Sequence, residues 1–177
     1  MTAPGFTLFG TAIGHCAIAW SERGIIGVQL PGSHANATRA RMRRRFPRAC
    51  DAPPPPDIEH AIEGIVALLR GEPRTLQSLA LDMEDVLPFD RRVYEVARTI
   101  LPGATLTYGE VAARLGEPDT AREVGRALGQ NPFALVVPCH RVVAAAGKPG
   151  GFSVRGGVAL KLRLLSIEAG QVELTTM

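Results

Sequence analysis

The chain has 177 residues, of which 46% are hydrophobic and 21% charged, and its formal net charge is +3. These values are typical of a folded protein with one domain or two small ones. No run of roughly 18 apolar residues is present, and the N-terminus lacks a basic stretch followed by an apolar one, so we expect neither a membrane span nor a signal peptide.

Three cysteines stand at positions 16, 50 and 139, an odd number without the spacing of metal ligands. Reduced thiols are typical of the cytoplasm, which is therefore the expected location. The histidines of the N-terminal half also lack metal-site spacing, and we expect no metal and no other cofactor. The positive net charge permits nucleic-acid binding without requiring it.

Short apolar stretches separated by turn residues predict three strands near the N-terminus, over residues 6–13, 17–21 and 25–30. A helix is predicted over 38–46. Two interpretations fit the arginines of this region, either a solvated face or a patch that contacts phosphates. These residues are Arg39, Arg41, Arg43, Arg44, Arg45 and Arg48.

Four prolines at 53–56 predict a stiff connector to a second helix. Asp57 can cap this helix, whose apolar stripe runs from Ile58 to Leu69 and ends before Gly71. Apolar residues at 79, 81 and 83 predict a further strand. We place a domain boundary near Val86, with an N-terminal α/β structural domain over 1–86 and a C-terminal domain over 87–177.

The second half begins with a predicted helix over 88–100, followed by two segments that share a helix start signal. Thr107-x-x-Glu110 and Thr120-x-x-Glu123 both match a capping box, in which the Thr side chain accepts from a backbone N–H three residues later. They predict helices over 108–115 and from 120 to about 128. The pair has the pattern of a helix-turn-helix.

The second of these helices has an unusual outer face. Gly125 and Gly129 lie there with Arg122 and Arg126, opposite the apolar side. Glycine in a helix interior costs about 1 kcal/mol, so two on one face suggest close approach to a partner, and the arginines favour nucleic acid. The alternative is two ordinary surface glycines, the second merely ending the helix.

Residues 133–137 are all apolar and lie between prolines, which predicts a short buried strand that ends at Cys139 and His140. Consecutive side chains of an extended chain point to opposite faces. The two residues can therefore cooperate only if the chain turns at Cys139 or a water molecule relays the proton. Five glycines over 147–157 predict a mobile wall beside this segment.

Cys139 is either a small buried hydrophobe or a nucleophile. A nucleophilic thiol must lose its proton, and His140 and Arg141 offer a base and a positive charge. Glu168 is the candidate to orient His140, at the edge of an apolar stripe on a predicted helix over 157–169; it could equally be a solvated carboxylate. The stripe comprises Val158, Leu162, Leu165 and Ala169.

Several of these motifs together resemble the O6-alkylguanine-DNA alkyltransferases, also called methylated-DNA–protein-cysteine methyltransferases. The centre of the match is Pro138-Cys139-His140-Arg141-Val142-Val143. Asn131-Pro132 precedes it, and Lys161-x-x-Leu164-Leu165-x-x-Glu168 follows it. Thr107-Tyr108-Gly109-Glu110 and Ala121-Arg122-x-x-Gly125 stand at the expected separations. The resemblance covers about half of the chain, residues 87–170, while the first half is only compatible with it.

This resemblance implies an α+β fold, with a small N-terminal sheet-and-helix domain that is RNase H-like. A mainly helical, winged-helix-like C-terminal domain would contain the helix-turn-helix. It also implies a direct-reversal DNA repair protein, a monomer without cofactor, that binds double-stranded DNA through the minor groove. Such a protein flips out O6-alkylguanine, and also O4-alkylthymine, and transfers the alkyl group irreversibly to Cys139, once per molecule.

The family implies catalytic roles for five residues. They are the nucleophile, its base, the group that orients the base, the brace of the preceding turn, and a phenol that donates to the guanine ring: Cys139, His140, Glu168, Asn131 and Tyr108. Three residues would bind the flipped base: Val142, Phe152 and Ser153. Four would contact DNA, with Arg122 replacing the extruded nucleotide and small residues permitting close approach: Arg122, Ala121, Gly125 and Arg126.

The chain departs from the family pattern around Phe152, where many relatives carry tyrosine, and the segment 152–157 is two residues longer than the shortest family versions.

Two other classes of function stay under consideration. One is a non-catalytic protein that binds alkyl lesions or regulates transcription. The other is a thiol hydrolase that turns over, using Cys139, His140 and Glu168.

Overall fold

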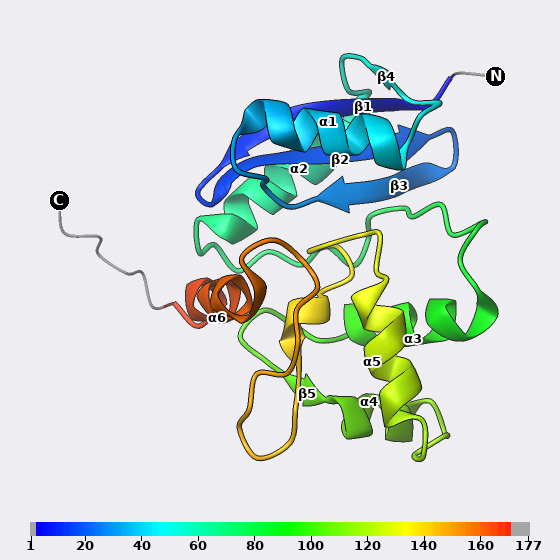
Figure 1. Ribbon diagram of the computed structural model, residues 1–177, viewed down its shortest axis with the longest axis vertical. Coiled ribbons are helices and arrows are strands. Elements are labelled where there is room, and N and C mark those ends of the chain that lie inside the picture. The colour runs from blue at the N-terminus through cyan, green and yellow to red at the C-terminus, as the bar shows by residue number, and fades with distance from the viewer. Residues whose placement is uncertain (1–2, 171–177) are drawn as a thin grey trace, which may run out of the picture.

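The computed structural model describes residues 3–170, which form a mixed α+β structure with a small sheet and six α-helices (Figure 1). The sheet and two helices come from the first half of the chain, and four helices come from the second, as expected from the sequence. The division into domains at residue 86 stays a prediction, and residues 171–177 of the second domain lie outside the described part.

The three predicted strands are confirmed. β1 (Gly5–Thr11), β2 (Gly14–Ser21) and β3 (Gly24–Gln29) form an antiparallel meander, and the short β4 (Cys50–Asp51) pairs parallel to β1, giving the order β3-β2-β1-β4. Alternate residues of the central strand β2 enter two separate cores. Both faces of the sheet are therefore covered.

Helix α1 (Ala35–Arg45) covers one face of the sheet and α2 (Pro56–Leu69) the other (Figure 1). Helix α1 begins three residues earlier than predicted because the His34 side chain accepts a hydrogen bond from the Ala37 N–H at 3.2 Å. The prediction that Asp57 caps α2 is wrong. Pro55 holds the cap position and Asp57 lies in the first turn, because a proline fits the first turn of a helix without loss of a hydrogen bond.

The predicted strand near residue 81 is also wrong. Leu81 forms only an isolated bridge with Ile25 of β3. The Asp82 carboxylate accepts hydrogen bonds from the Ser21 hydroxyl at 2.6 Å and from the Glu84 N–H at 3.1 Å. An aspartate that binds the backbone two residues ahead makes a turn, so the segment leaves the sheet at once.

The second half of the chain contains α3 (Pro88–Arg98), β5 (Leu106–Thr107), α4 (Tyr108–Arg114), α5 (Ala121–Gly129), a 3-10 turn (Cys139–Arg141), β6 (Val142–Val143) and α6 (Gly157–Glu168). The Thr107 hydroxyl accepts from the Glu110 N–H at 3.0 Å, which confirms the first capping contact. The second is wrong: the Thr120 hydroxyl donates to the Glu117 carbonyl at 2.7 Å and caps nothing.

The two halves meet along strand β3. The Val28 N–H donates to the Pro132 carbonyl at 2.9 Å, and Val28 forms a bridge with Phe133. One large hydrophobic core continues from the sheet through α2, α3 and α5. The sheet thus supports the chain segment that leads to Cys139. Among residues 3–170, no helix has the length and apolar character to cross a bilayer.

Candidate active site

The segment before Cys139 is a buried turn, so the prediction of an extended strand over 133–137 is wrong. Leu135 has a φ of +71°, and the Val137 N–H donates back to the Phe133 carbonyl at 2.8 Å. Asn131 holds this turn closed: its side-chain oxygen accepts from the Phe133 N–H and its amide donates to the Val137 carbonyl, both at 2.9 Å. The apolar composition reflects burial, which a tight turn satisfies as well as a strand does.

Cys139, His140 and Arg141 form a single 3-10 turn, so the chain does turn at the cysteine. This is one of the two conditions under which the thiol and the imidazole can cooperate. The Nε2 atom of His140 lies 2.7 Å from Oε1 of Glu168. The predicted contact between these two residues is therefore present, and both side chains are almost fully buried.

Glu168 comes from the inward face of α6, and the apolar stripe predicted for this helix is wrong. Val158 and Leu162 are 39% and 50% exposed, whereas Lys161 and Leu164 are buried. Residues 161, 164 and 168 follow helical spacing on one face. The apolar stripe was misleading because two of the three inward residues carry charges that have partners inside the protein.

The Glu168 carboxylate also binds Arg141, whose Nε and terminal nitrogen donate to its two oxygens at 2.9 Å and 2.8 Å. Burial alone would raise the pKa of Glu168, but the hydrogen bonds and charges of His140 and Arg141 lower this pKa to about 2. Glu168 is thus ionised in the folded protein. It neutralises the buried guanidinium and accepts from the imidazole at the same time.

The acceptor on Glu168 fixes the tautomer of His140. Burial lowers the pKa of His140 despite the opposing effect of Glu168, so the ring is neutral near pH 7. A neutral imidazole that donates from Nε2 keeps its lone pair on Nδ1. The Nδ1 atom is buried and has no protein hydrogen-bond partner among the described residues. The ring is therefore set up to accept a proton at Nδ1.

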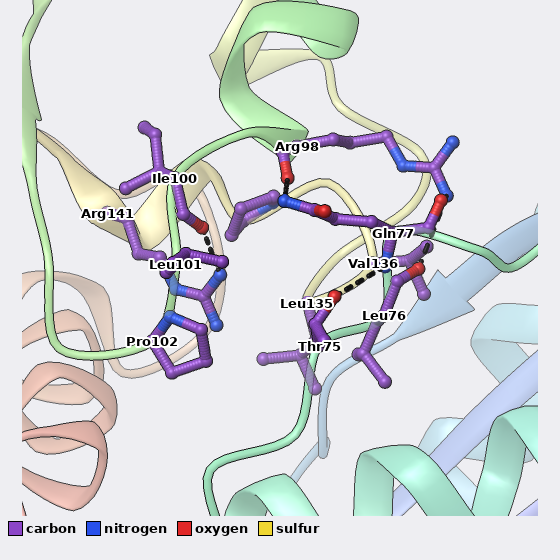
Figure 2. A pocket seen from close by; sticks show the side chains of 11 residues that line it. Thr75, Leu76, Gln77, Arg98, Ile100, Leu101, Pro102, Leu135, Val136 and Arg141 are labelled. Atoms are coloured by element: carbon purple, nitrogen blue, oxygen red, sulfur yellow. Dashed lines mark hydrogen bonds between the residues drawn. The ribbon is translucent and has the colours of Figure 1, made fainter.

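Behind this turn, a second contact holds Arg141 in place. Its other terminal nitrogen donates to the Ile100 carbonyl at 2.6 Å, as Figure 2 shows. Arg98, on the far side of the same small cavity, donates to carbonyls of the 76–79 segment, including that of Leu79 at 2.7 Å. The cavity is only about 10 Å³. This side is a packed support, and the open side of the turn faces the other way.

The Cys139 thiol is protonated at rest, because burial raises its pKa. The Asn131 side chain, the positive charge of Lys161 and backbone N–H groups oppose this rise. The thiol therefore needs a base to form a thiolate, together with groups that stabilise the charge once formed. Lys161 is such a group, and sequence reasoning assigned it no role.

Lys161 is fully buried beneath the site. Its Nζ donates to the Gly151 carbonyl at 3.1 Å and to the Tyr108 hydroxyl at 3.4 Å. Burial raises the pKa of Tyr108, which keeps the phenol protonated and able to donate. Gly150 has a φ of +76°, and a Cβ there would lie 2.8 Å from the Tyr108 hydroxyl. The glycine-rich loop thus packs its backbone directly against the phenol.

Two cavities open beside Cys139. The first, of about 260 Å³, lies under helix α5 and is lined by Tyr108, Gly125, Leu128, Gly129, Cys139, Gly151, Phe152 and Ser153. The second, of about 230 Å³, extends toward the sheet and shares five lining residues with the first: Leu128, Gly129, Cys139, Phe152 and Ser153. Val142 lines neither cavity. It is fully buried in β6, and its contact with the base stays a prediction.

Helix α5 presents an exposed surface above the first cavity. Tyr94 of α3 donates to the Ala127 carbonyl at 2.7 Å and holds the helix from below. Arg122 is exposed, whereas Arg126 forms an ion pair with the buried carboxylate of Asp90 at 2.8 Å. A Cβ at Gly125 would meet only the Tyr108 ring, at 3.9 Å, which is ordinary contact. Nothing inside the protein requires a glycine there.

The structure thus brings Cys139, His140, Glu168, Asn131 and Tyr108 into one site beside Phe152, Ser153 and the outer face of α5. Ala121 begins that helix at its first residue, away from both cavities. Across residues 3–170, His, Cys, Asp and Glu side chains form no group of three that could hold a metal ion.

The sequence was compared with known proteins. Residues 88–170 match the family described as 6-O-methylguanine DNA methyltransferase, DNA binding domain. A methylated-DNA–protein-cysteine methyltransferase of Methanothermobacter thermautotrophicus is 42% identical over 123 residues, which are 70% of this chain and 68% of that protein. Regulatory protein ada of Salmonella typhimurium is 35% identical over 95% of this chain, which spans only 46% of that relative.

Among solved structures, Mycobacterium tuberculosis OGT in complex with DNA superposes with a TM-score of 0.78 at 29% sequence identity, covering 96% of each chain. The similarity therefore extends over the sheet and the helical half alike. With the identity to the Methanothermobacter protein over two thirds of its length, it follows that this chain belongs to the methylated-DNA–protein-cysteine methyltransferase family.

Proposed function

We propose that this protein repairs DNA by transferring the alkyl group of O6-alkylguanine to its own Cys139, once per molecule. The observation that carries the proposal is the position of Cys139, which lies at the base of a cavity under helix α5 and is followed by the buried pair of His140 and Glu168. A thiol, a neutral base with a free nitrogen and an ionised orienting group are the parts that nucleophilic catalysis needs.

The reaction begins when His140 Nδ1 takes the thiol proton through a water molecule, while Glu168 holds the opposite nitrogen as a donor. The thiolate, stabilised by Lys161, attacks the alkyl carbon in line with the C–O6 bond. The S–C bond forms as the C–O6 bond breaks, and the electron pair moves into the guanine ring. Tyr108 donates a hydrogen bond to the ring as this charge develops. Guanine finally takes up one proton, which balances the proton lost by the thiol.

The thioether that results has no acyl carbon for water to attack, so the side chains around Cys139 have no way to hydrolyse it. The alkyl group therefore stays on Cys139, and each protein molecule acts once. Phe152 and Ser153 line the cavity and would contact the base.

We propose that the lesion reaches this cavity by base flipping from duplex DNA bound through its minor groove, because a thiol cannot reach O6 inside a stack. Helices α4 and α5 would act as a helix-turn-helix, with Arg122 in the space left by the extruded nucleotide. Ala121 and Gly125 would allow close approach, and Arg126 would add charge. The DNA complex of the Mycobacterium tuberculosis protein supports DNA as the partner.

The finer fold assignments belong to the same proposal. The order β3-β2-β1-β4, with β4 parallel to β1, supports an RNase H-like N-terminal half. The short β5–β6 pair beside α4 supports a winged-helix-like C-terminal half. We further propose that the protein works as a monomer in the cytoplasm, where DNA and a reducing environment are both available.

The deciding experiment is intact-mass measurement after incubation with a duplex that contains one O6-methylguanine. We expect a gain of one methyl group per protein, located on Cys139 and absent in Cys139→Ala. Lesion binding without any gain in mass would indicate a sensor of alkylated DNA. Release of methanol with repeated turnover would indicate a thiol hydrolase.

A further inference from the structure

The second cavity beside Cys139 lies where the two halves of the chain meet. Its walls include Gln29 and Leu30 at the end of β3, together with Arg41 and Arg45 of α1. Five residues line both this cavity and the cavity under α5: Leu128, Gly129, Cys139, Phe152 and Ser153. Cys139 thus borders two adjoining cavities, and Arg41 and Arg45 line only the second of them.

The two arginines of this cavity have no carboxylate counterion in the part of the chain that the structure describes. Arg41 and Arg45 are one helical turn apart, and both donate to the Gln29 side-chain oxygen, at 3.1 Å and 2.9 Å. Arg45 is further fixed by the carbonyls of Val28 and Pro132, at 3.3 Å and 3.2 Å. Neither guanidinium forms an ion pair with a carboxylate within residues 3–170.

This arrangement is costly without an anion. Burial, and to a lesser extent the charge of Arg41, lowers the pKa of Arg45 to about 10. Like charges one turn apart on a helix repel each other. By contrast Arg39 of the same helix is paired with Asp51. Two unpaired guanidiniums around one neutral amide oxygen are suited to receive a negatively charged group.

We propose that this second cavity accepts the outer part of O6 substituents that end in a carboxylate, with Arg41 as the residue that selects for the negative charge. The inference rests on the proposed alkyl transfer to Cys139 and names a substrate class for it, guanines with O6-carboxyalkyl groups. Arg41 is exposed at the rim and free to move onto the ligand, while Arg45 is held in the wall and adds a fixed positive charge.

The geometry of the displacement makes this side of Cys139 available. Sulfur, carbon and O6 must lie in line, so the remainder of the alkyl group extends sideways from that line. The guanine occupies the cavity under α5, which leaves the second cavity for the substituent. In the reaction the S–C bond forms and the C–O6 bond breaks as for a methyl group. The carboxylate is unchanged, and the product is an S-carboxyalkyl cysteine.

The test compares single-turnover transfer from three duplexes that differ only in the lesion: O6-methylguanine, O6-(3-carboxypropyl)guanine and its uncharged amide, O6-(3-carbamoylpropyl)guanine. The acid and the amide are nearly equal in size, so their rate ratio reports on charge. We expect the unmodified protein to prefer the acid by roughly tenfold. In Arg41→Gln this ratio should fall to about one, and in the matched control Arg43→Gln, on the exposed side of the same helix, it should be retained.

Two results would overturn the inference. The first is equal transfer of acid and amide by the unmodified protein. The second is a loss in Arg41→Gln that is equal on all three lesions, because Arg41 would then contact a DNA phosphate common to all of them. Absence of methyl transfer from the first duplex would instead refute the proposed function itself, so the two failures can be distinguished.

Discussion

The carboxylate of Glu168 lies 2.7 Å from Nε2 of His140, and the two side chains are only 3% and 1% exposed. This contact joins the last turn of α6 to the residue that follows the thiol. Because the same carboxylate is also bound by Arg141, it cannot rotate away from the imidazole. The tautomer of His140 is thus set by a group that is itself fixed on two sides.

Glu168→Gln tests this relationship. The amide can present an N–H to Nε2, which would move the ring proton to Nδ1 and remove the base. We expect methyl transfer in a single turnover to slow by about 10²- to 10⁴-fold, the usual contribution of general acid–base catalysis. Glu63→Gln, an exposed glutamate of α2, is the control. An unchanged rate in Glu168→Gln would remove Glu168 from the mechanism.

The same group predicts how stability depends on pH. The pKa of Glu168 is about 2 in the folded protein against 4.5 for the free group, so its contribution is present above pH 4.5 and is lost as the pH falls toward 2. The lowered pKa of His140 also reduces stability as the pH falls, because this histidine takes up its proton at a higher pH in the unfolded state than in the folded state. We expect the free energy of unfolding in urea to fall between pH 7 and pH 3.

Glu168→Gln should start from lower stability and show a flatter dependence between pH 5 and pH 2. Near neutral pH, the free energy of unfolding of Glu168→Gln should be lower than that of the unmodified protein by on the order of 3 kcal/mol. This figure corresponds to the shift in the pKa of Glu168 on folding. Parallel curves would mean that the Glu168 carboxylate is not the titrating group.

Lys161→Met separates a role in chemistry from a role in packing. Replacing a buried charge that has no carboxylate partner by an apolar side chain of similar length is neutral or stabilising. Its removal should nevertheless slow transfer by about tenfold or more and shift the rate–pH profile to higher pH, because the thiolate loses a nearby positive charge. Lys148→Met, in an exposed loop, is the control. A lower melting temperature with an unchanged pH profile would indicate packing alone.

Gly125→Ala should change stability and DNA binding in opposite directions. The free protein has room for the added methyl, and alanine in a helix interior gains about 0.5–1 kcal/mol over glycine, so the melting temperature should rise. If α5 approaches DNA as proposed, the methyl should keep the helix away and weaken duplex binding. Thermal melting and a fluorescence-anisotropy titration at fixed salt measure the two effects. Undiminished affinity would place DNA elsewhere on the surface.

Sequence patterns were sufficient to predict those strands, helices and caps that depend on residues close together in the chain. The strands at the N-terminus, α2, α3 and the Thr107 cap follow from periodicity and turn residues. The Thr120 signal was wrong because its hydroxyl bonds backward to the preceding turn. Residues 133–137 were assigned to a strand because apolar composition reports burial and not extension.

The site could be predicted only in part, for a physical reason. Counting hydrophobic residues on α6 leaves Lys161 outside the apolar stripe and Glu168 only at its edge, whereas each is buried with partners from distant segments. The spacing of Lys161 with Leu164 and Glu168 on one helical face was the signal that could have revealed Lys161. The positions of Arg41 and Arg45 beside Cys139 depend on packing between the two halves, which no local pattern records.

The arrangement of Glu168 also has a consequence for the order in which the protein becomes active during synthesis. Glu168 follows His140 by 28 residues and belongs to the final turn of α6. The sheet and the turn around Cys139 precede that helix in the chain and leave the ribosome before it. Until α6 docks, His140 lacks the group that orients it and Cys139 lacks the charge of Lys161. We therefore expect the Cys139 thiol to be unreactive before α6 docks, so that the single transfer of the proposed function is reserved for the folded protein.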